Sequence, residues 1–324
     1  MITISSTPAA PARISVVVPV LNAERFLQDA LSSVRSQDVG PVELIVVDDG
    51  SEDDSVHIAR RYADVLLQTP GRQGPSFSRN MGAAAASGEL LAFLDADDVW
   101  LTEHLRIAVT ALSQAPEADV FFSQVRAFGA DDYVTGAGTG VPAWMAFDAR
   151  IPLIGRNIVT QITVVLRRRS FDLVGGYDIR LRFAEDYDLW HRLAARGAFV
   201  HVPRVTARYR VHQAQASNAK EMLHRSGWEV RARHFAALCN SDSAAAARAA
   251  GVLADAWRSE AKWTVRMGDR ELHALFASMY PEVAHVLAVH GFQPPNQVPW
   301  SALSAEWHRF KRGVRALVAP GRAG

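Results

Sequence analysis

The stretch "LLAFLDADDVW", residues 90–100, runs from a short apolar segment directly into three carboxylates, Asp95, Asp97 and Asp98. Residues 90–94 have the length and apolar character of a strand that is buried on both faces. Like charges a few ångströms apart raise one another's pKa, so three carboxylates at a strand end are costly unless a cation lies among them. Mg²⁺ and Mn²⁺ prefer oxygen ligands, and Mg²⁺ is often held by one or two carboxylates together with substrate phosphates. The stretch therefore predicts a metal site that acts on a phosphate-containing substrate.

One simpler interpretation of the same carboxylates stays open. Asp97 or Asp98 could cap a helix that is expected to begin near residue 102 or 103. Because one carboxylate is enough for a cap, the presence of three favours the metal site.

Outward from this stretch, short apolar runs alternate with segments of helical periodicity. The expected strands are residues 14–20, 42–47, 65–68 and 90–94. Helices are expected after each of the first three, with Asn22 as the N-cap of the first, Asp53 or Asp54 capping the second, and residues 76–86 forming the third. This alternation predicts an α/β fold built from parallel βαβ units, whose ligand site lies at the carboxyl ends of the strands. Neither GxGxxG after the first strand nor GxxxxGK[ST] is present, so the dinucleotide and P-loop signatures are missing.

Composition sets the class of protein. The chain has 324 residues, of which 49% are hydrophobic, so it can bury a large core. A formal net charge of +1 gives no overall electrostatic reason to expect nucleic acid as a partner. The single cysteine, Cys239, excludes an internal disulfide and is expected to be a small core residue. No signal peptide and no apolar run of about 20 residues are found, which predicts a cytoplasmic location.

Five segments together resemble a known family. They are "VVVPVLNAERFLQDALSSVRSQ", "ELIVVDDGSEDDS", "GPSFSRNMG", "LLAFLDADDVW" and "VGGYDIRLRFAEDYDLWHRL". Their order and spacing resemble those of the family 2 inverting glycosyltransferases of the non-processive, bacterial type, which have the GT-A fold. The resemblance covers roughly residues 14–212 and implies a divalent cation, Mn²⁺ or Mg²⁺, that bridges the diphosphate of a nucleotide-sugar donor.

The resemblance assigns roles on the donor side. Asp95-Ala96-Asp97 would be the DxD motif, with Asp97 as the direct metal ligand, Asp95 near the ribose or a metal-bound water, and Asp98 behind them. The nucleotide would be contacted by Pro19, Val20, Glu24, Asp49 and Arg79.

Two of these donor-side assignments have ordinary alternatives. Asp48 and Asp49 also suit a simple turn with Gly50 and Ser51, and Glu24 could merely favour a helix N-terminus. For Arg79 the functional interpretation is favoured, because a structural arginine is better placed near the C-terminal end of a helix.

The resemblance also assigns the acceptor side. Asp186 in "FAEDYDLW" would be the general base that deprotonates the acceptor hydroxyl in a single inverting displacement, and Glu185 would orient it or bind the acceptor. The alternative is that Glu185 and Asp186 only favour the N-terminus of the helix that follows. In "YRVH", the resemblance implies that His212 completes the metal sphere, while a partly buried surface histidine is the simpler alternative.

The expected domain organisation has three parts. Residues 1–13 form a flexible N-terminus, 14–216 a catalytic domain with a nucleotide-binding half (about 14–100) and an acceptor half (about 101–216), and 217–324 a helical C-terminal appendage. Within the acceptor half, Arg167 to Arg169 are interpreted as a solvated basic run outside the site. The Gly175-Gly176 bend is expected to need φ > 0.

The last predicted helix, within residues 299–318, has one apolar stripe and several basic residues. It could contact an anionic membrane peripherally and deliver a lipid-linked acceptor, or pack against the catalytic domain or a dimer partner.

The predicted function is metal-dependent transfer of a single sugar from a nucleotide-sugar, UDP by resemblance, to a glycan or lipid-linked acceptor hydroxyl in polysaccharide or glycoconjugate synthesis. The absence of the "QxxRW" segment of processive synthases supports single transfer. Two alternatives remain open: a sugar nucleotidyltransferase, and an inactive scaffold domain that binds nucleotide-sugars. The sequence leaves the oligomeric state open.

Overall fold

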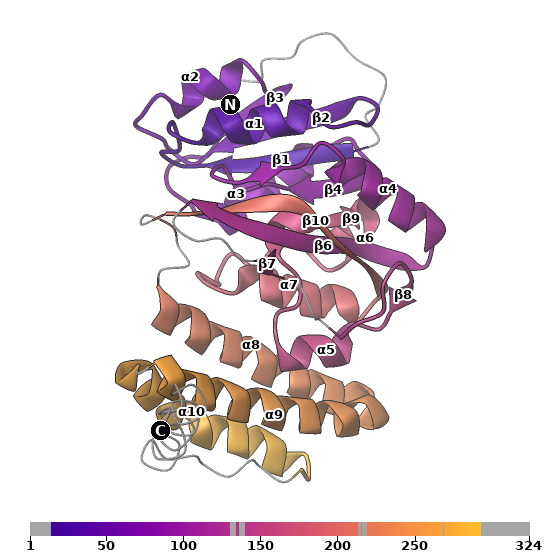
Figure 1. Ribbon diagram of the computed structural model, residues 1–324, viewed down its shortest axis with the longest axis vertical. Coiled ribbons are helices and arrows are strands. Elements are labelled where there is room, and N and C mark those ends of the chain that lie inside the picture. The colour runs from indigo at the N-terminus through magenta and orange to yellow at the C-terminus, as the bar shows by residue number, and fades with distance from the viewer. Residues whose placement is uncertain are drawn as a thin grey trace, which may run out of the picture. The chain divides into compact units, whose positions relative to one another are not determined.

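The computed structural model describes residues 14–129, 134–135, 140–212, 215, 219–267 and 269–292. The described residues fall into two compact units (Figure 1). The N-terminal unit comprises those within Met1–Leu153 and Asn157–Asn218, and the C-terminal unit those within Ile154–Arg156 and Ala219–Gly324. The predicted split of the catalytic domain into a nucleotide half and an acceptor half stays a prediction.

The strands of the N-terminal unit form one mixed sheet. Its order is β3-β2-β1-β4-β9-β6-β10-β5, with β7 paired to β6 and β8 paired to β10. The strands are β1 Ile14–Val20, β2 Val42–Asp48, β3 Val65–Gln68, β4 Leu90–Phe93, β5 Val99–Trp100, β6 Ala118–Gly129, β7 Val134–Thr135, β8 Ala146–Phe147, β9 Val165–Arg167 and β10 Ala198–Val211.

The direction of the strands brings the predicted site together at one edge. β1 is parallel to β2 and β4, and β6 is parallel to β10. β9 runs antiparallel to both β4 and β6, so β4, β6 and β10 point the same way. The carboxyl ends of β1, β2, β4 and β10 therefore lie at the same edge of the sheet. The predicted α/β fold is confirmed, and its sheet is mixed, because β5, β7, β8 and β9 pair antiparallel to their neighbours.

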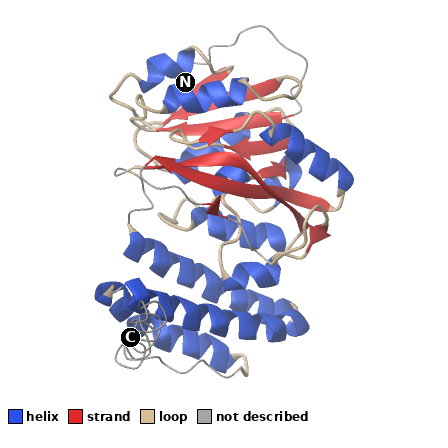
Figure 2. Ribbon diagram, in the orientation of Figure 1, coloured by secondary structure: helices blue, strands red, loops and turns tan. Residues whose placement is uncertain are grey.

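Helices cover both faces of this sheet (Figure 2). Along β1, Val16, Val18 and Val20 belong to the core that includes Leu31 of α1, whereas a Cβ added at Gly82 of α3 would collide with Val17. Alternate residues of a strand point to opposite faces, so both faces of β1 are buried, which explains its continuous apolar run. The helices of this part of the chain are α1 Leu27–Arg35, α2 Ser55–Arg60, α3 Pro75–Ala85, α4 His104–Gln114, α5 Arg150–Gly155, η1 Gln161–Thr163, α6 Arg168–Leu173 and α7 Glu185–Ala194.

The expected start of the first helix is wrong. α1 begins at Leu27, and Asn22 lies in the preceding turn with φ +49°. The Asn22 side chain accepts a hydrogen bond from the Glu52 N–H at 2.8 Å, and the Asn22 N–H donates to the Ser51 hydroxyl. Asn22 therefore joins the turns after β1 and β2. Asparagine tolerates the left-handed region that this turn requires.

The C-terminal unit is helical in its described residues, which form α8 Lys220–Ser241, α9 Ser243–Met267 and α10 Arg270–Val289. Trp228 and Trp257 are buried with ring centroids 5.1 Å apart, and Glu260 accepts hydrogen bonds from Trp228 and Arg231. Cys239 is half-buried and is not the core residue that was expected. Within the described residues, none of the helices has the length and apolar character needed to cross a bilayer. The basic amphipathic segment within 299–318 lies outside the described residues.

Candidate active site

Asp97 and His212 meet at the carboxyl edge of the sheet, although 115 positions separate them in the chain. The His212 Nε2 lies 2.8 Å from Asp97 Oδ2. Burial, followed by the charge of Asp95, raises the pKa of Asp97, while the hydrogen bond from His212 opposes this shift. A carboxylate that is partly desolvated and close to a second carboxylate is stabilised by a cation.

Asp97 and His212 fit a shared divalent cation chemically, because carboxylate and imidazole are both ligands of Mn²⁺. Over the described ranges, no group of three or more His, Cys, Asp or Glu side chains is arranged to hold a metal ion. Two protein ligands suit an ion that is otherwise bound by water and substrate phosphates, as is common for Mg²⁺.

Asp98 joins the two segments that carry this pair. It is fully buried, and its Oδ1 accepts a hydrogen bond of 2.7 Å from the backbone N–H of Arg210. The Arg210 side chain donates to the backbone carbonyl of Asp97 and stacks on Phe26 and Phe128. Burial, followed by the charges of Asp97 and Asp95, raises the pKa of Asp98 well above its usual value. Asp98 therefore fixes the end of β10 beside the DxD turn.

The alternative in which Asp97 or Asp98 caps a helix is wrong. The helix that follows, α4, begins at His104, and its N-cap residue Glu103 makes no side-chain capping bond. Asp97 faces His212 and Asp98 binds Arg210, so neither carboxylate serves α4.

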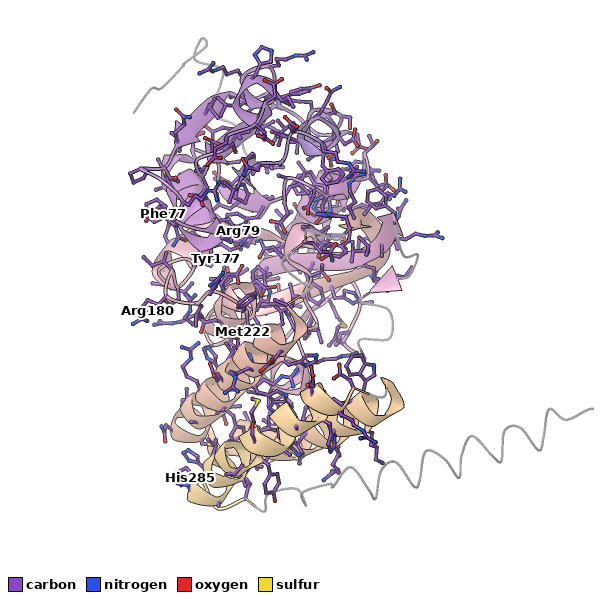
Figure 3. The ribbon with its side chains drawn as sticks, turned by 90° about the vertical axis from the view of Figure 1, so that its left-hand side faces the viewer. Phe77, Arg79, Tyr177, Arg180, Met222 and His285 are labelled. Atoms are coloured by element: carbon purple, nitrogen blue, oxygen red, sulfur yellow. The ribbon has the colours of Figure 1, made fainter. Side chains whose placement is uncertain are left out.

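Arg79 connects the two acidic motifs. It lies in α3, its side chain is only 6% exposed, and its guanidinium pairs with Asp95 at 2.7 Å and with Glu185 at 3.1 Å. Burial disfavours its charge, but Asp95 leads the interactions that outweigh burial and raise the pKa of Arg79. The guanidinium also lies over the ring of Tyr177, 5.4 Å from its centroid, and both residues are labelled in Figure 3. Arg79 is thus buried between Asp95 and Glu185, with both of its terminal nitrogens engaged.

Asp186 stands in the first turn of α7, beside Glu185. Its Oδ1 accepts the backbone N–H of Tyr187 at 2.7 Å, and its Oδ2 accepts an amide hydrogen of Asn157 at 3.3 Å. Burial and then the neighbouring charge of Glu185 raise the pKa of Asp186 to about 7. A carboxylate with a pKa near the working pH is suited to general-base catalysis.

The helix-terminus interpretation of Glu185 and Asp186 is incomplete. Both lie in the first turn of α7, where a negative charge is favourable, and Asp186 accepts the Tyr187 N–H in that turn, whereas the N-cap residue, Ala184, makes no capping bond. Glu185 is instead paired with Arg79, and Asp186 with Asn157.

Asn157 is a member of this site that the sequence interpretation missed. Its Oδ1 accepts the backbone N–H of Val159 at 3.2 Å, and this turn directs the amide nitrogen toward Asp186. An isolated asparagine in "GRNIVT" carries no recognisable motif, so only the fold reveals its position.

Four of the residues expected around the nucleotide lie at the end of β1 or in the turns after β1 and β2. Pro19 and Val20 end β1, and Glu24 accepts a hydrogen bond from the Asp54 N–H. Asp49 is buried and organises the loop after β3, accepting hydrogen bonds from the Thr69 hydroxyl and from two backbone N–H groups, those of Gln73 and Gly74. Their contact with a nucleotide stays a prediction.

Two of the three consecutive arginines that were interpreted as a solvated run have structural contacts. Arg167 donates to the carbonyls of Leu112 in the last turn of α4, of Pro116 just beyond it, and of Ala118 at the start of β6. Arg168 donates to the carbonyl of Ala86, the residue that ends α3. Arg169 is 75% exposed, as that interpretation requires.

Comparisons with known proteins identify the class of this chain. Residues 15–174 match the profile described as glycosyl transferase family 2. The chain is 24% identical over 210 residues to an uncharacterized glycosyltransferase of Rickettsia prowazekii, a match that covers 63% of this chain and 66% of that relative. It is 29% identical over 192 residues to a PGL/p-HBAD biosynthesis glycosyltransferase of Mycobacterium tuberculosis, covering 57% of this chain and 71% of the relative.

Solved structures agree on the fold. S. aureus TarS 1-349 in complex with UDP-GlcNAc superposes with a TM-score of 0.63 at 19% identity, covering 85% of this chain and 80% of that one. The mannosyltransferase PcManGT of Pyrobaculum calidifontis, in complex with GDP-Man and Mn²⁺, gives a TM-score of 0.54 at 18% identity over 95% and 89% of the chains. The expected GT-A fold is confirmed by these neighbours. By sequence profile, relatives and fold, the N-terminal unit of this chain belongs to glycosyl transferase family 2.

Proposed function

We propose that this chain is a metal-dependent inverting glycosyltransferase. It transfers a single sugar from a nucleoside-diphosphate sugar, most simply a UDP-sugar, to a hydroxyl of a glycan or lipid-linked acceptor in polysaccharide or other glycoconjugate synthesis. The observation that carries the proposal is the junction at Arg79, which brings the DxD turn and the Glu185–Asp186 pair to one edge of the sheet. The complexes of TarS with UDP-GlcNAc and of PcManGT with GDP-Man and Mn²⁺ support a nucleotide-sugar donor.

The residues have separable tasks in this reaction. Asp97 and His212 would hold the cation, which supplies Lewis-acid stabilisation of the charge that develops on the leaving diphosphate. Asp186 would accept the proton of the acceptor hydroxyl as that oxygen attacks the anomeric carbon from the face opposite the leaving group. A pKa of about 7 makes this carboxylate a better base than an exposed aspartate.

The donor half is tested by thermal shift with UDP, GDP, dTDP and CDP, each with Mn²⁺ and with EDTA. We expect one nucleotide to stabilise the wild type only when metal is present, and Asp97→Ala and His212→Ala to lose most of that stabilisation. Asp255→Ala is the matched control, because that carboxylate is 74% exposed and lies in the C-terminal unit. Stabilisation that ignores both metal and Asp97 would contradict the metal assignment.

Turnover separates the three candidate functions. A transferase releases the nucleoside diphosphate from its sugar donor without added pyrophosphate, whereas a sugar nucleotidyltransferase needs pyrophosphate to cleave the donor. An inactive scaffold binds the donor and releases nothing. Asp186→Asn should bind nucleotide as the wild type does and should lower the rate of transfer by about 100-fold or more.

A further inference from the structure

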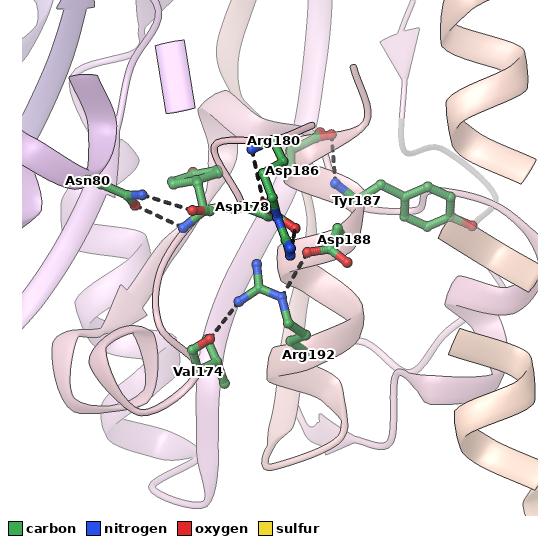
Figure 4. Close-up of polar contacts among 9 residues, drawn as sticks. Asn80, Val174, Asp178, Arg180, Asp186, Tyr187, Asp188 and Arg192 are labelled. Atoms are coloured by element: carbon green, nitrogen blue, oxygen red, sulfur yellow. Dashed lines mark hydrogen bonds and ion pairs between the residues drawn. The ribbon is translucent and has the colours of Figure 1, made fainter. Parts of the chain in front are cut away.

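The bend that precedes the Glu185–Asp186 pair is hydrogen-bonded to α3 through the side chain of Asn80. The Asn80 amide nitrogen donates to the backbone carbonyl of Tyr177 at 2.8 Å, and its Oδ1 accepts the backbone N–H of Tyr177, also at 2.8 Å. Figure 4 shows both bonds. The amide thus pairs with Tyr177 as a neighbouring β-strand would, and satisfies both polar groups of one peptide segment.

The close contact between the bend and Asn80 requires a glycine at position 176. It has φ +68°, and a Cβ added there would lie 2.5 Å from Asn80 Oδ1 and 3.1 Å from the Phe171 ring. A side chain at position 176 would therefore push the bend away from α3 and would also strain the backbone. Gly175, with φ +80°, has open space around its Cβ position, so the close approach is specific to Gly176.

A hollow adjoins the bend. Its volume is about 400 Å³, and it is lined by the bend itself together with Asn80, Arg180 and Arg192. Ile179, which lines this hollow, is 59% exposed. The bend is also held by Arg192, which donates to the carbonyl of Val174, and by the N–H groups of Gly175 and Gly176, which donate to the last carbonyls of α6. The contact with α3 is made by Asn80 and by the Tyr177 ring.

The Tyr177 side chain links the bend to the Glu185–Asp186 pair. Its ring is buried against Phe93 of β4, and its hydroxyl donates to Gln161. The ring lies beneath the Arg79 guanidinium, which is itself paired with Glu185. Asn80 and Arg79 are consecutive residues of α3, so the helix that carries the ion pair to Glu185 also fixes the ring on which that arginine rests.

We infer that Asn80 is a positioning residue, which through Tyr177 and Arg79 holds Glu185 and Asp186 at the distance from the DxD turn that transfer requires. The inference rests on the proposed function. A small displacement of a catalytic group can cost about 100-fold in rate, while the binding of nucleotide and metal rests mainly on the strand ends and on Asp97 with His212, and should change much less.

The test compares Asn80→Ala with Gln37→Ala, at a temperature well below both unfolding transitions. Gln37 is a matched control, because its amide also makes hydrogen bonds to backbone groups. These belong to Ser33, Leu101 and Leu105, none of which is part of the bend. Both variants should lose thermal stability to a similar degree. We expect Asn80→Ala to lower kcat by about 10- to 100-fold with the Kd for nucleotide and Mn²⁺ within about threefold of wild type, and Gln37→Ala to keep kcat within about twofold.

If Asn80→Ala does not fold, Gly176→Ala tests the same contact from the side of the bend, with Gly175→Ala as its control. The inference is overturned if Asn80→Ala, or Gly176→Ala in its place, keeps kcat within about twofold of wild type, or if the variant and its control lose kcat equally. A wild type that binds no nucleotide and cleaves no donor would instead refute the proposed function.

Discussion

At the scale of single residues, the pKa of Asp186 controls the pH dependence of the proposed reaction. Only the ionised carboxylate can accept a proton, and burial together with Glu185 raises its pKa to about 7. We therefore expect kcat/KM for the acceptor, at saturating donor and metal, to fall about tenfold per pH unit well below 7 and to level off above it. A pH–rate profile from pH 5 to pH 9 measures this acidic limb, the part of the profile in which kcat/KM falls.

Two neighbours of Asp186 should move that limb in opposite directions. Glu185→Gln removes a negative charge that raises the pKa of Asp186, so the limb should shift to lower pH. Asn157→Ala removes a hydrogen bond that stabilises the ionised form, so the limb should shift to higher pH. If the limb keeps its position in both variants, the group that titrates is not Asp186.

The sequence shows which residues are candidates for the site, but not which side chains they contact. The motifs identified Asp97, His212, Glu185 and Asp186, because residue type and order along the chain are visible in the sequence. The contact between Asp97 and His212, and that between Arg79 and Glu185, span more than 100 positions and depend on the order of strands in the sheet. Asn157 has no motif around it, and its role follows only from where the chain places it.

At the scale of elements, the Arg167 side chain holds the end of α4. The last carbonyls of a helix have no partner within it, and Arg167 donates to the carbonyl of Leu112 in the last turn and to those of Pro116 and Ala118 just beyond. Arg167→Met keeps the apolar stem and removes these bonds, so the free energy of unfolding should fall by about 1–3 kcal/mol.

Arg169 is the matched control for that measurement. It lies two positions along, is 75% exposed, and its nearest charged contact is Asp119 at 3.5 Å. Exposed ion pairs contribute little, so Arg169→Met should change the free energy of unfolding by less than about 0.5 kcal/mol. Chemical denaturation measures the free energy of unfolding of both variants. Equal decreases in the two would mean that the carbonyl contacts of Arg167 do not stabilise α4.

The strands of the sheet were predictable as elements, but their arrangement was only partly so. The apolar runs that form β1 to β4 are short and continuous, which is typical of strands buried on both faces. Nothing local in Val165–Arg167 indicates that β9 runs antiparallel between β4 and β6, because pairing partners are chosen by the whole sheet. Asn22 was mistaken for a cap because its side chain suits caps and left-handed turns equally.

At the scale of the whole molecule, a buried histidine in the N-terminal unit links stability to pH. His104 of α4 is fully buried between Trp100 and Phe121, and its Nδ1 lies 2.7 Å from the Thr206 hydroxyl. Burial lowers its pKa to about 3. The unfolded chain, in which a histidine has its ordinary pKa near 6.5, therefore binds more protons than the folded protein between about pH 6.5 and pH 3.

The folded protein therefore loses stability relative to the unfolded chain as the pH falls from about 6.5 toward 3, and above about pH 6.5 His104 causes no such loss. The variant that isolates it is His104→Phe, which keeps a ring against Trp100 and leaves the Thr206 hydroxyl bonded to that of Ser123. The variant lacks the titrating group, so its free energy of unfolding relative to wild type should rise by on the order of 1 kcal/mol for each pH unit below about 6. Denaturation curves at pH 7.5, 6, 5 and 4 measure that difference, and one that is constant with pH would show that His104 stays accessible to protons in the folded protein.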